Sequence, residues 1–409
     1  MGDRLRRALY SHQRGYRALA FLLVGLVALG AYAVAVRLPD SSIPGWVLKA
    51  RREAVQTARR GQAAIREART ARHLPINPGD RFRTGLIGVA SSPVTTELGS
   101  LASHRTSTDP VFAAAVVQML YTAGVRAGSL VAVGQTGSYP GFDLDVEAAV
   151  EAMGARSVSV SMIGSSAFGA TEPRLTWIDM EAALAQAGVL HHRSDAVGPG
   201  GSFAGKDAST RMRMVQRSGL PPLPVLPSTD TVTFLDRLYV REANRLGKPI
   251  AAFVDVGGSS AIIGSAGAET IIRPGLSRPR WTPFQARRLG VVGRMALRGV
   301  PIVALVNVSA LAKRFGVPFD PHLPPSAGDI AAPPPNPVAI GLALALLIAL
   351  VVGMHRLGLF RVPSWEVPAG LRRAARRPPP PRSEQESPTG GAVREEGRQR
   401  TSRKAPVGG

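Results

Sequence analysis

The amino-acid sequence predicts an α/β domain with an open, mostly parallel sheet, placed between two membrane-spanning helices. Three observations predict this architecture. Two apolar segments carry no charge over the length of a bilayer. Between them, short apolar runs alternate with segments of helical pattern. The runs at 248–258 and 300–308 are almost continuously apolar, as is typical of strands buried on both faces of a parallel sheet. These features together predict a doubly wound, Rossmann-like domain.

The composition limits the chemistry. The chain has 409 residues, no cysteine and a net charge of +22. The lack of cysteine excludes disulfides, iron–sulfur clusters, thiolate metal sites and cysteine nucleophiles. Residues 1–17 carry +4 and residues 355–409 carry +7, which leaves +11 for the spans and the region between them. A basic outer region attracts anionic partners.

The two apolar segments are predicted to cross a bacterial cell membrane. The first, 18–36, has 19 residues without a charge, which at 1.5 Å per residue is about the thickness of the hydrocarbon core. The second is 337–354. Arginines precede the first span in residues 1–17 and follow the second in 355–409, so the positive-inside rule puts both termini in the cytoplasm. The main domain is then extracytoplasmic, and the protein passes the membrane twice.

Two alternatives to this topology remain open. The first segment is also compatible with a cleaved signal peptide, because Ala33-Val34-Ala35 resembles an A-x-A cleavage site. The second could be a buried core helix, although proline before it and arginine after it fit a membrane exit better. The tail at 355–409 is rich in arginine and proline, and its composition predicts disorder.

The segment 37–74 is predicted to be a helical stalk. It is rich in Ala, Arg and Glu, and small apolar residues recur at helical spacing in a weakly amphipathic pattern. A basic helix lying on the membrane surface is the alternative. The stalk interpretation is the stronger one and predicts a solvated helix.

The α/β domain is predicted to span 75–330. Helix signals include Asp109 followed by proline at the start of one helix and Gly188 at the end of another. The predicted elements are, in order, an apolar run at 85–90, a helix at 109–124, a strand at 129–138, a helix at 142–154, a strand at 157–164, a helix at 175–188, strands at 248–258 and 300–308, and an edge hairpin within 259–275.

Four loops are predicted to meet at one edge of the sheet. They are 91–108, 134–141, 164–174 and 255–260, and all combine glycine with hydroxyl side chains. Ligands of open α/β sheets bind at the carboxyl ends of the strands, and such loops can line a concave anion site. Ordinary βα turns have a similar composition. The candidate ligand-binding residues are Thr95, Thr96, His104, Arg105, Ser107, Thr136, Ser138, Ser165, Arg174, Gly257 and Gly258.

The stretch GGSFAGKD at 200–207 matches a phosphate-binding loop except at its last position. A P-loop needs Ser or Thr after the lysine as a Mg²⁺ ligand, and Asp207 stands there instead. No strand is predicted before Gly200, and a compartment without ATP does not suit such a loop. The stretch is interpreted as part of a glycine-rich excursion over 193–209, from which Arg193 and Lys206 could reach an anionic ligand.

Enzyme signatures are weak. The serines after Gly164 are offset by one position from G-x-S-x-G, and no G-x-G-x-x-G follows a predicted strand. The adjacent pair His191-His192 cannot face one metal ion from a strand, so no metal site is expected, and no cofactor is identified. The candidate catalytic residues are Asp255, Ser138 and Glu97. A helix cap, a turn or a satisfied buried carboxylate are the alternative roles for such residues.

Several segments resemble the poly-gamma-glutamate system protein family, whose members are membrane-anchored proteins of poly-γ-glutamate capsule biosynthesis. The segments that carry the resemblance are 93–114, 131–149, 164–181, 253–258 and 300–321. The runs L-G-S-L-x-x-x-R-T-S-T and W-x-D-M-E are its most distinctive motifs. The resemblance implies a process and transfers no catalytic residue.

The partners expected on this basis are poly-γ-glutamate or another anionic polymer, membrane synthase or export subunits, and the lipid bilayer, with no nucleic acid. One hypothesis is an accessory protein that binds or guides the polymer during synthesis, export or anchoring. The alternative is an extracytoplasmic enzyme that hydrolyses or transfers γ-glutamyl chains. A scaffold for synthase subunits, without polymer contact, is the third.

Overall fold

The computed structural model describes residues 22–35, 43–201, 210–211, 213, 223–227, 230–264, 270–323 and 337–356. The predicted basic N-terminus and the tail beyond Arg356 lie outside these residues, as do Lys206 and Asp207.

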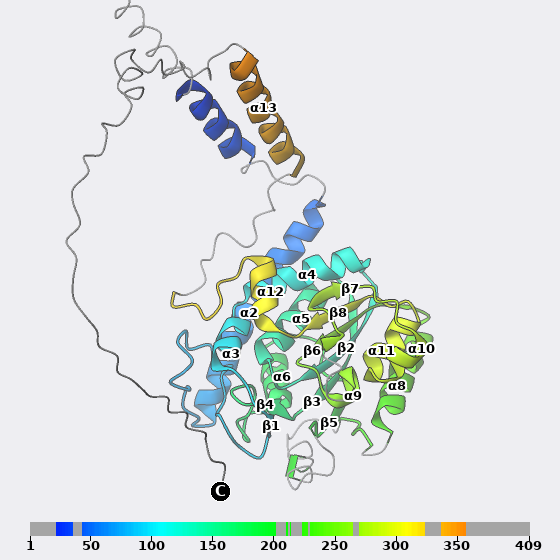
Figure 1. Cartoon of the computed structure of the whole chain (residues 1–409). Helices are drawn as coiled ribbons and strands as arrows, with labels where there is room; N and C mark the ends of the chain where they lie inside the picture. The colour runs from blue at the N-terminus through cyan, green and yellow to red at the C-terminus, as the bar shows by residue number, and fades with distance from the viewer. Residues whose placement is uncertain are drawn as a thin grey trace, which may run out of the picture. The chain divides into compact units, whose positions relative to one another are not determined.

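The core of the protein is a six-stranded sheet with the order β5-β3-β2-β6-β8-β7 (Figure 1). All neighbouring strands are parallel except β7, which runs antiparallel to β8 at one edge. The predicted open, mostly parallel α/β sheet is therefore confirmed. Its strands are β2 (Leu130–Thr136), β3 (Arg156–Met162), β5 (Ala196–Gly198), β6 (Ile250–Val256), β7 (Gly275–Ser277) and β8 (Ile302–Leu305). A separate parallel pair joins β1 (Thr95–Glu97) to β4 (Ser165–Ser166).

The central strands have no solvent-facing side. All seven residues of β2 are buried, and its side chains alternate between two hydrophobic clusters. Val131 and Val133 belong to the cluster on one face, whereas Leu130 and Ala132 belong to the cluster on the other. This burial explains the continuous apolar runs that predict the strands.

Helices cover both faces of the sheet (Figure 1). One face packs against α4 (Val111–Ala123), α5 (Pro140–Ala152), α6 (Trp177–Gln186) and α12 (Val308–Phe315). The other packs against α8 (Thr231–Leu246), α9 (Ser260–Ile263) and α11 (Gly290–Leu297), with the short helix α10 (Pro283–Arg287) beside α11. A further short helix, α3 (Leu101–Ser107), follows β1.

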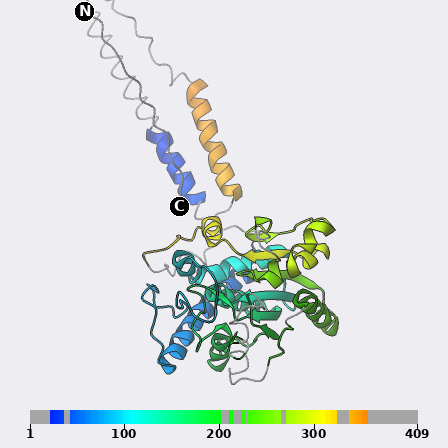
Figure 2. The ribbon, with the colours of Figure 1, turned by 60° about the horizontal axis from the view of Figure 1, so that its bottom comes forward.

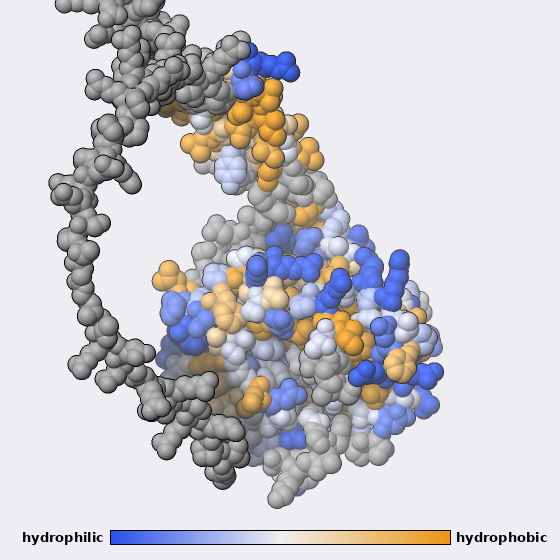
Figure 3. All heavy atoms as spheres, viewed as in Figure 1, coloured by the Kyte–Doolittle hydropathy of each residue, from blue (hydrophilic) through white to orange (hydrophobic). Residues whose placement is uncertain are grey.

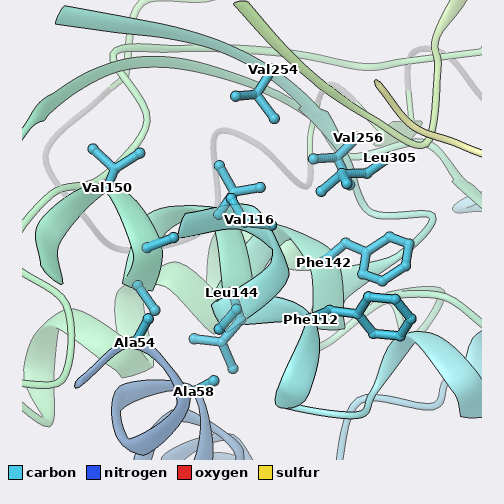
Figure 4. Close-up of a cluster of buried hydrophobic side chains, with 14 of the residues drawn as sticks. Ala54, Ala58, Phe112, Val116, Phe142, Leu144, Val150, Val254, Val256 and Leu305 are labelled. Atoms are coloured by element: carbon cyan, nitrogen blue, oxygen red, sulfur yellow. The ribbon is translucent and has the colours of Figure 1, made fainter. Parts of the chain in front are cut away.

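The helix predicted as a solvated stalk is part of this domain. Helix α2 (Gly45–Ala71) contacts α4, α5 and α6 and forms an outer layer over them. Its small residues allow a close approach, since a Cβ at Gly61 would lie 2.6 Å from Leu144 Cδ1. Ala54 and Ala58 point into the same cluster as Leu144 (Figure 4). The stalk interpretation is therefore wrong for this helix, and the domain begins near residue 43 instead of 75.

Two further expectations are corrected. No hairpin forms among the described residues of 259–275, which are 259–264 and 270–275: residues 260–263 form α9, and β7 is an edge strand paired with β8. Strand β5 lies inside the predicted excursion 193–209 and precedes Gly200, so a strand does stand before GGSFAGKD.

The apolar run 85–90 forms no strand. It is held to α2 by the buried Arg69, whose guanidinium donates to the carbonyl oxygens of Gly85 and Ile87 over 2.6 and 3.0 Å.

One helix among the described residues is long and apolar enough to cross a membrane. It is α13 (Pro337–Arg356), coloured orange in Figure 2, and its segment Val338–Arg356 has a mean hydropathy of 2.5. The first predicted span contributes a shorter apolar helix, Leu22–Ala35, to the described residues.

Candidate functional site

The sheet has a topological switch point between β2 and β6. From β2 the chain proceeds through β3 to β5 on one side, and from β6 through β8 on the other. The helices that follow β2 and β6, α5 and α9, therefore cover opposite faces of the sheet, and a crevice is expected outside the carboxyl ends of the two strands. Ligands of open α/β sheets bind at this position.

A cavity of about 470 Å³, the switch-point cavity, lies at the carboxyl edge of the sheet. Each of the four loops predicted to meet there contributes lining residues, and Gly201, after β5, adds a fifth segment. The lining consists of hydroxyl side chains, glycines and one carboxylate: Thr96, Glu97, Thr136, Ser138, Gly164, Gly201, Gly258, Ser259 and Ser260. The prediction that these loops lie together is confirmed.

Hydrogen bonds hold the end of β2 in place. The Thr136 hydroxyl donates to the carbonyl oxygen of Val256 over 3.3 Å and accepts from the Ser138 amide over 3.2 Å. The Ser138 hydroxyl oxygen accepts from the Ser166 amide over 3.1 Å. The hydroxyl proton of Ser138 has no acceptor among the described residues, so it can donate to a ligand in the cavity that Ser138 lines.

The end of β6 needs glycine. Gly257 and Gly258 have φ values of +75° and +60°, the left-handed region that favours glycine. A Cβ at Gly257 would lie 2.4 Å from Thr136 Oγ1 and 2.9 Å from Ser138 Cβ. A side chain here would push the two loops apart. The glycine pair thus allows the close approach of the loops after β2 and β6.

Asp255 is the second-last residue of β6, just before these glycines. Its side chain is fully buried and does not line the cavity. Neither carboxylate oxygen forms a hydrogen bond within the described residues, and the hydroxyl of the neighbouring Ser259 is also buried without a partner there. Burial raises the pKa of Asp255 to about 7, against a smaller opposing effect of the nearby Gly258 amide. Three oxygen atoms without a hydrogen-bond partner in the described residues therefore lie within five residues of chain, at the end of β6 and the start of α9.

These oxygens do not amount to a metal centre. No group of three or more His, Asp or Glu side chains within the described residues could hold a metal ion. One carboxyl group and a hydroxyl fall short of the six or more oxygen ligands that a hard cation takes. A carboxyl group with a pKa near 7 can instead carry or release a proton at neutral pH.

One wall of the cavity is the short parallel pair β1–β4. Thr96 donates to the carbonyl oxygen of Ser165 over 3.2 Å, and both Thr96 and Glu97 line the cavity. Ser165 is fully buried and donates to the carbonyl oxygen of Gly137 over 2.7 Å. The hydroxyl of Thr95 accepts from the Ser92 amide over 3.0 Å. Ser165 and Thr95 therefore shape the wall without reaching a ligand.

His104 forms a pair with Ser166 behind this wall. Nδ1 of His104 lies 2.8 Å from the carbonyl oxygen of Ser100, which can only accept, so Nδ1 carries the proton. Nε2 is then the acceptor for the Ser166 hydroxyl at 3.0 Å. Burial lowers the pKa of His104, and its ring stacks on Tyr139 with centroids 4.8 Å apart. This is a nucleophile–base geometry, but both side chains are buried and neither lines the cavity.

Three predicted site residues lie elsewhere. Arg105 forms an ion pair with Asp320 over 2.9 Å. Ser107 donates to the carbonyl oxygen of His104 over 2.8 Å, as a side chain within α3. Arg174 is exposed and does not line the cavity. The loop 91–108 folds into α3 at residue 101, and no residue of this helix lines the cavity.

The sequence did not indicate two residues near the site. Ser166 is 62 positions from His104, so only the folded chain brings them together. Arg211 is buried and donates to the carbonyl oxygens of Pro199 and Gly200, the residues just before the cavity-lining Gly201, over 3.0 and 3.3 Å. It lies just beyond the predicted excursion 193–209, in a stretch rich in arginine and other polar residues that gives no signal of burial.

Comparison with known proteins gives no match: no protein-family model, no curated protein and no solved structure is similar to the chain.

Proposed function

We propose that the protein is a membrane-anchored accessory component of poly-γ-glutamate biosynthesis, export or anchoring, and that its domain binds γ-glutamyl chains at the switch-point cavity. One observation carries this proposal. The loops that bear most of the family-like motifs, far apart in the sequence, all contribute to one polar cavity at the carboxyl edge of the sheet. A ligand site is a direct reason for such motifs to lie together.

The chemistry of the lining supports a γ-glutamyl ligand. Such a chain alternates amide groups with carboxylates, so it needs donors at regular intervals. Hydroxyl groups of Ser138, Ser259 and Ser260 can donate to both kinds of oxygen. A volume of about 470 Å³ is within the usual range of ligand pockets and suits a segment of a few residues. Glu97 is the one carboxylate of the lining and opposes an anionic ligand.

The proposed topology has two membrane spans, 18–36 and 337–354, with both termini in the cytoplasm of a bacterium and the domain outside. Support comes from α13, which is long enough to span, and from the arginines that flank both apolar segments. Cysteine labelling tests it, because the chain has no natural cysteine. A membrane-impermeant thiol reagent on intact cells should label a cysteine placed at exposed Ser91 and spare one placed in the tail. Labelling of the tail would contradict this topology.

Binding is tested with the full chain in neutral lipid nanodiscs and short γ-glutamyl oligomers, by calorimetry. Ser260→Phe should fill the cavity and weaken binding at least about tenfold. Glu97→Gln should strengthen it, because a like charge is removed. Ser91→Phe, an exposed serine that does not line the cavity, is the matched control. The absence of binding by the unaltered protein, or equal binding by Ser260→Phe, would contradict the proposal.

A second candidate is an enzyme that hydrolyses or transfers the same chains. It is favoured by the unsatisfied carboxyl of Asp255 and by the free hydroxyl proton of Ser138 beside the cavity. Light scattering of long poly-γ-glutamate separates the candidates. A fall in polymer mass that is catalytic in protein and lost in Asp255→Asn and Ser138→Ala establishes the enzyme. Polymer of unchanged mass that co-elutes with the protein supports the accessory role.

A further inference from the structure

The segment 270–319, near the end of the domain, carries cations and no acidic side chain of its own. From Thr270 to Phe319 the sequence contains nine Lys and Arg residues and neither Asp nor Glu. This segment forms β7, α10, α11, β8 and α12. Figure 3 shows hydrophilic residues, with apolar ones among them, over the part of the surface formed by α8, α10 and α11. The positive potential of this surface is therefore not compensated by carboxylates of the same segment.

Two hollows on this surface are lined by arginines. The first, of about 470 Å³, lies beside α10 and α11 and contains Arg287, Arg288 and Arg294. The second, of about 600 Å³, follows the chain around β7 and contains Arg273, Arg278, Arg280 and Arg314 together with Trp281. Both are concave, so an occupant is surrounded by guanidinium groups instead of resting on a flat charged face.

Three of these arginines have structural roles. Arg278 donates to the carbonyl oxygens of Thr122 and Ala123 at the end of α4, over 3.2 and 3.0 Å. Arg294 pairs with Asp236 over 3.4 Å, and Arg314 donates to the carbonyl oxygen of Pro274 over 3.3 Å. These contacts hold β7 and α11 in place and shape the hollows.

The other four form the arginine track, which consists of Arg273, Arg280, Arg287 and Arg288. All four are exposed, and none of their guanidinium groups has a hydrogen-bond or ion-pair partner among the residues that the structure describes. Guanidinium groups match carboxylates with two parallel hydrogen bonds. Four such groups on one surface, without carboxylates of their own, are suited to a ligand with repeated carboxylates.

The arginine track leads to the switch-point cavity. Ser260 lines both that cavity and the first hollow, so the two adjoin. Arg280 and Trp281 line the second hollow, and α10, which starts two residues later, presents Arg287 to the first. A ligand long enough to occupy all three would pass from the β7 edge, around α10, to the carboxyl edge of the sheet.

We propose that the arginine track binds an extended polycarboxylate chain and guides it to the switch-point cavity. This inference rests on the proposed function for the chain's chemical identity. It adds a second, sequence-independent contact region that distinguishes long chains from short ones. Since affinity comes from repeated exposed ion pairs, the interaction weakens as salt concentration rises.

The test compares two fourfold variants of the full chain in neutral lipid nanodiscs. Arginine-to-glutamine changes at 273, 280, 287 and 288 remove the track. The matched control changes four exposed arginines on segments that do not form this surface, Arg52, Arg83, Arg156 and Arg174. Their guanidinium groups have no described partner, and the control variant has the same net charge. The probes are poly-γ-glutamate of about 100 residues and a γ-glutamyl trimer. The track variant should bind the long chain at least about tenfold more weakly, bind the trimer as before, and differ from the control.

An unchanged affinity for the long chain would overturn the inference, and so would an equal loss of affinity in the control variant. A third such result is that the track variant loses only its binding to vesicles containing phosphatidylglycerol, which would make the surface a membrane contact. The trimer separates the two proposals. If the trimer does not bind to the unaltered protein but the long chain binds through the arginine track, the cavity proposal fails and the track stands. If the trimer binds and the long chain gains nothing from the track, the reverse holds.

Discussion

Replacing Ile65 with alanine tests whether α2 belongs to the folded domain. Ile65 is fully buried in the cluster that α2 shares with α4, α5 and α6. Removal of a buried isoleucine side chain to alanine costs about 2–5 kcal/mol of unfolding free energy. Alanine has a higher helix propensity than isoleucine by a few tenths of a kcal/mol, which offsets this only slightly. A solvated stalk helix would instead change by less than about 0.5 kcal/mol.

Thermal unfolding of the full chain is the assay. A loss of about 3 kcal/mol corresponds to a fall in Tm of about 6–12 °C for a domain of this size class. Near-UV circular dichroism reports on it through the fully buried Trp177 of α6, which is not part of α2. Gln56→Ala, on an exposed position of the same helix, is the control and should shift Tm by less than about 2 °C. If both variants unfold at the temperature of the unaltered protein, α2 does not pack as described.

Three more predictions concern the extent of the domain, the close approach at Gly257 and the buried carboxyl of Asp255. A chain shortened to 75–330 lacks α2 and should be aggregated or without near-UV signal, whereas 43–330 should keep that signal. Gly257→Ala should weaken oligomer binding and lower stability more than the matched Gly247→Ala, which has φ +61° in open space and costs only the strain of about 1–2 kcal/mol. Burial raises the pKa of Asp255 from 3.8 to about 7 in the folded protein. The protonated carboxyl therefore contributes stability that is complete below pH 4 and is lost as the pH rises through 7. Denaturant titrations across this range should therefore show the unaltered protein losing on the order of 4 kcal/mol relative to Asp255→Asn.

The sheet could be predicted from the sequence because its central strands are buried on both faces. Strands β2, β6 and β8 lie within segments that were predicted as strands, and β3 begins one residue before its predicted segment, 157–164. Once the strands are parallel, their carboxyl ends must share an edge, so the meeting of the three loops after β2, β3 and β6 followed from topology. Strand β5 was missed because it has three residues within a glycine-rich stretch, too short for a pattern.

Helix α2 was misinterpreted for a different reason. Its buried face consists largely of alanines and Gly61, which add little apolar area, while its other positions are rich in arginine. A pattern of this kind looks solvated when only hydrophobicity is considered. The small residues instead let α5 approach closely, and all residues of α5 from Pro140 to Val150 are buried as a result. Tight packing between helices is a property of the pair, and neither sequence segment carries it alone.

The site residues show where the sequence stops being sufficient. The β1–β4 pair places the loop 91–108 at the predicted edge, but the start of α3 at Leu101 decides which side chains enter the cavity. Thr96 and Glu97, before the helix, line it, whereas His104 is directed inward to Ser166 and Arg105 outward to Asp320. The loops after β2 and β6 behave differently, because the clash that a side chain at Gly257 would make leaves no freedom in how they meet. Loop composition therefore predicts a site best where the backbone itself forms the wall, and worst where a helix intervenes between strand and ligand.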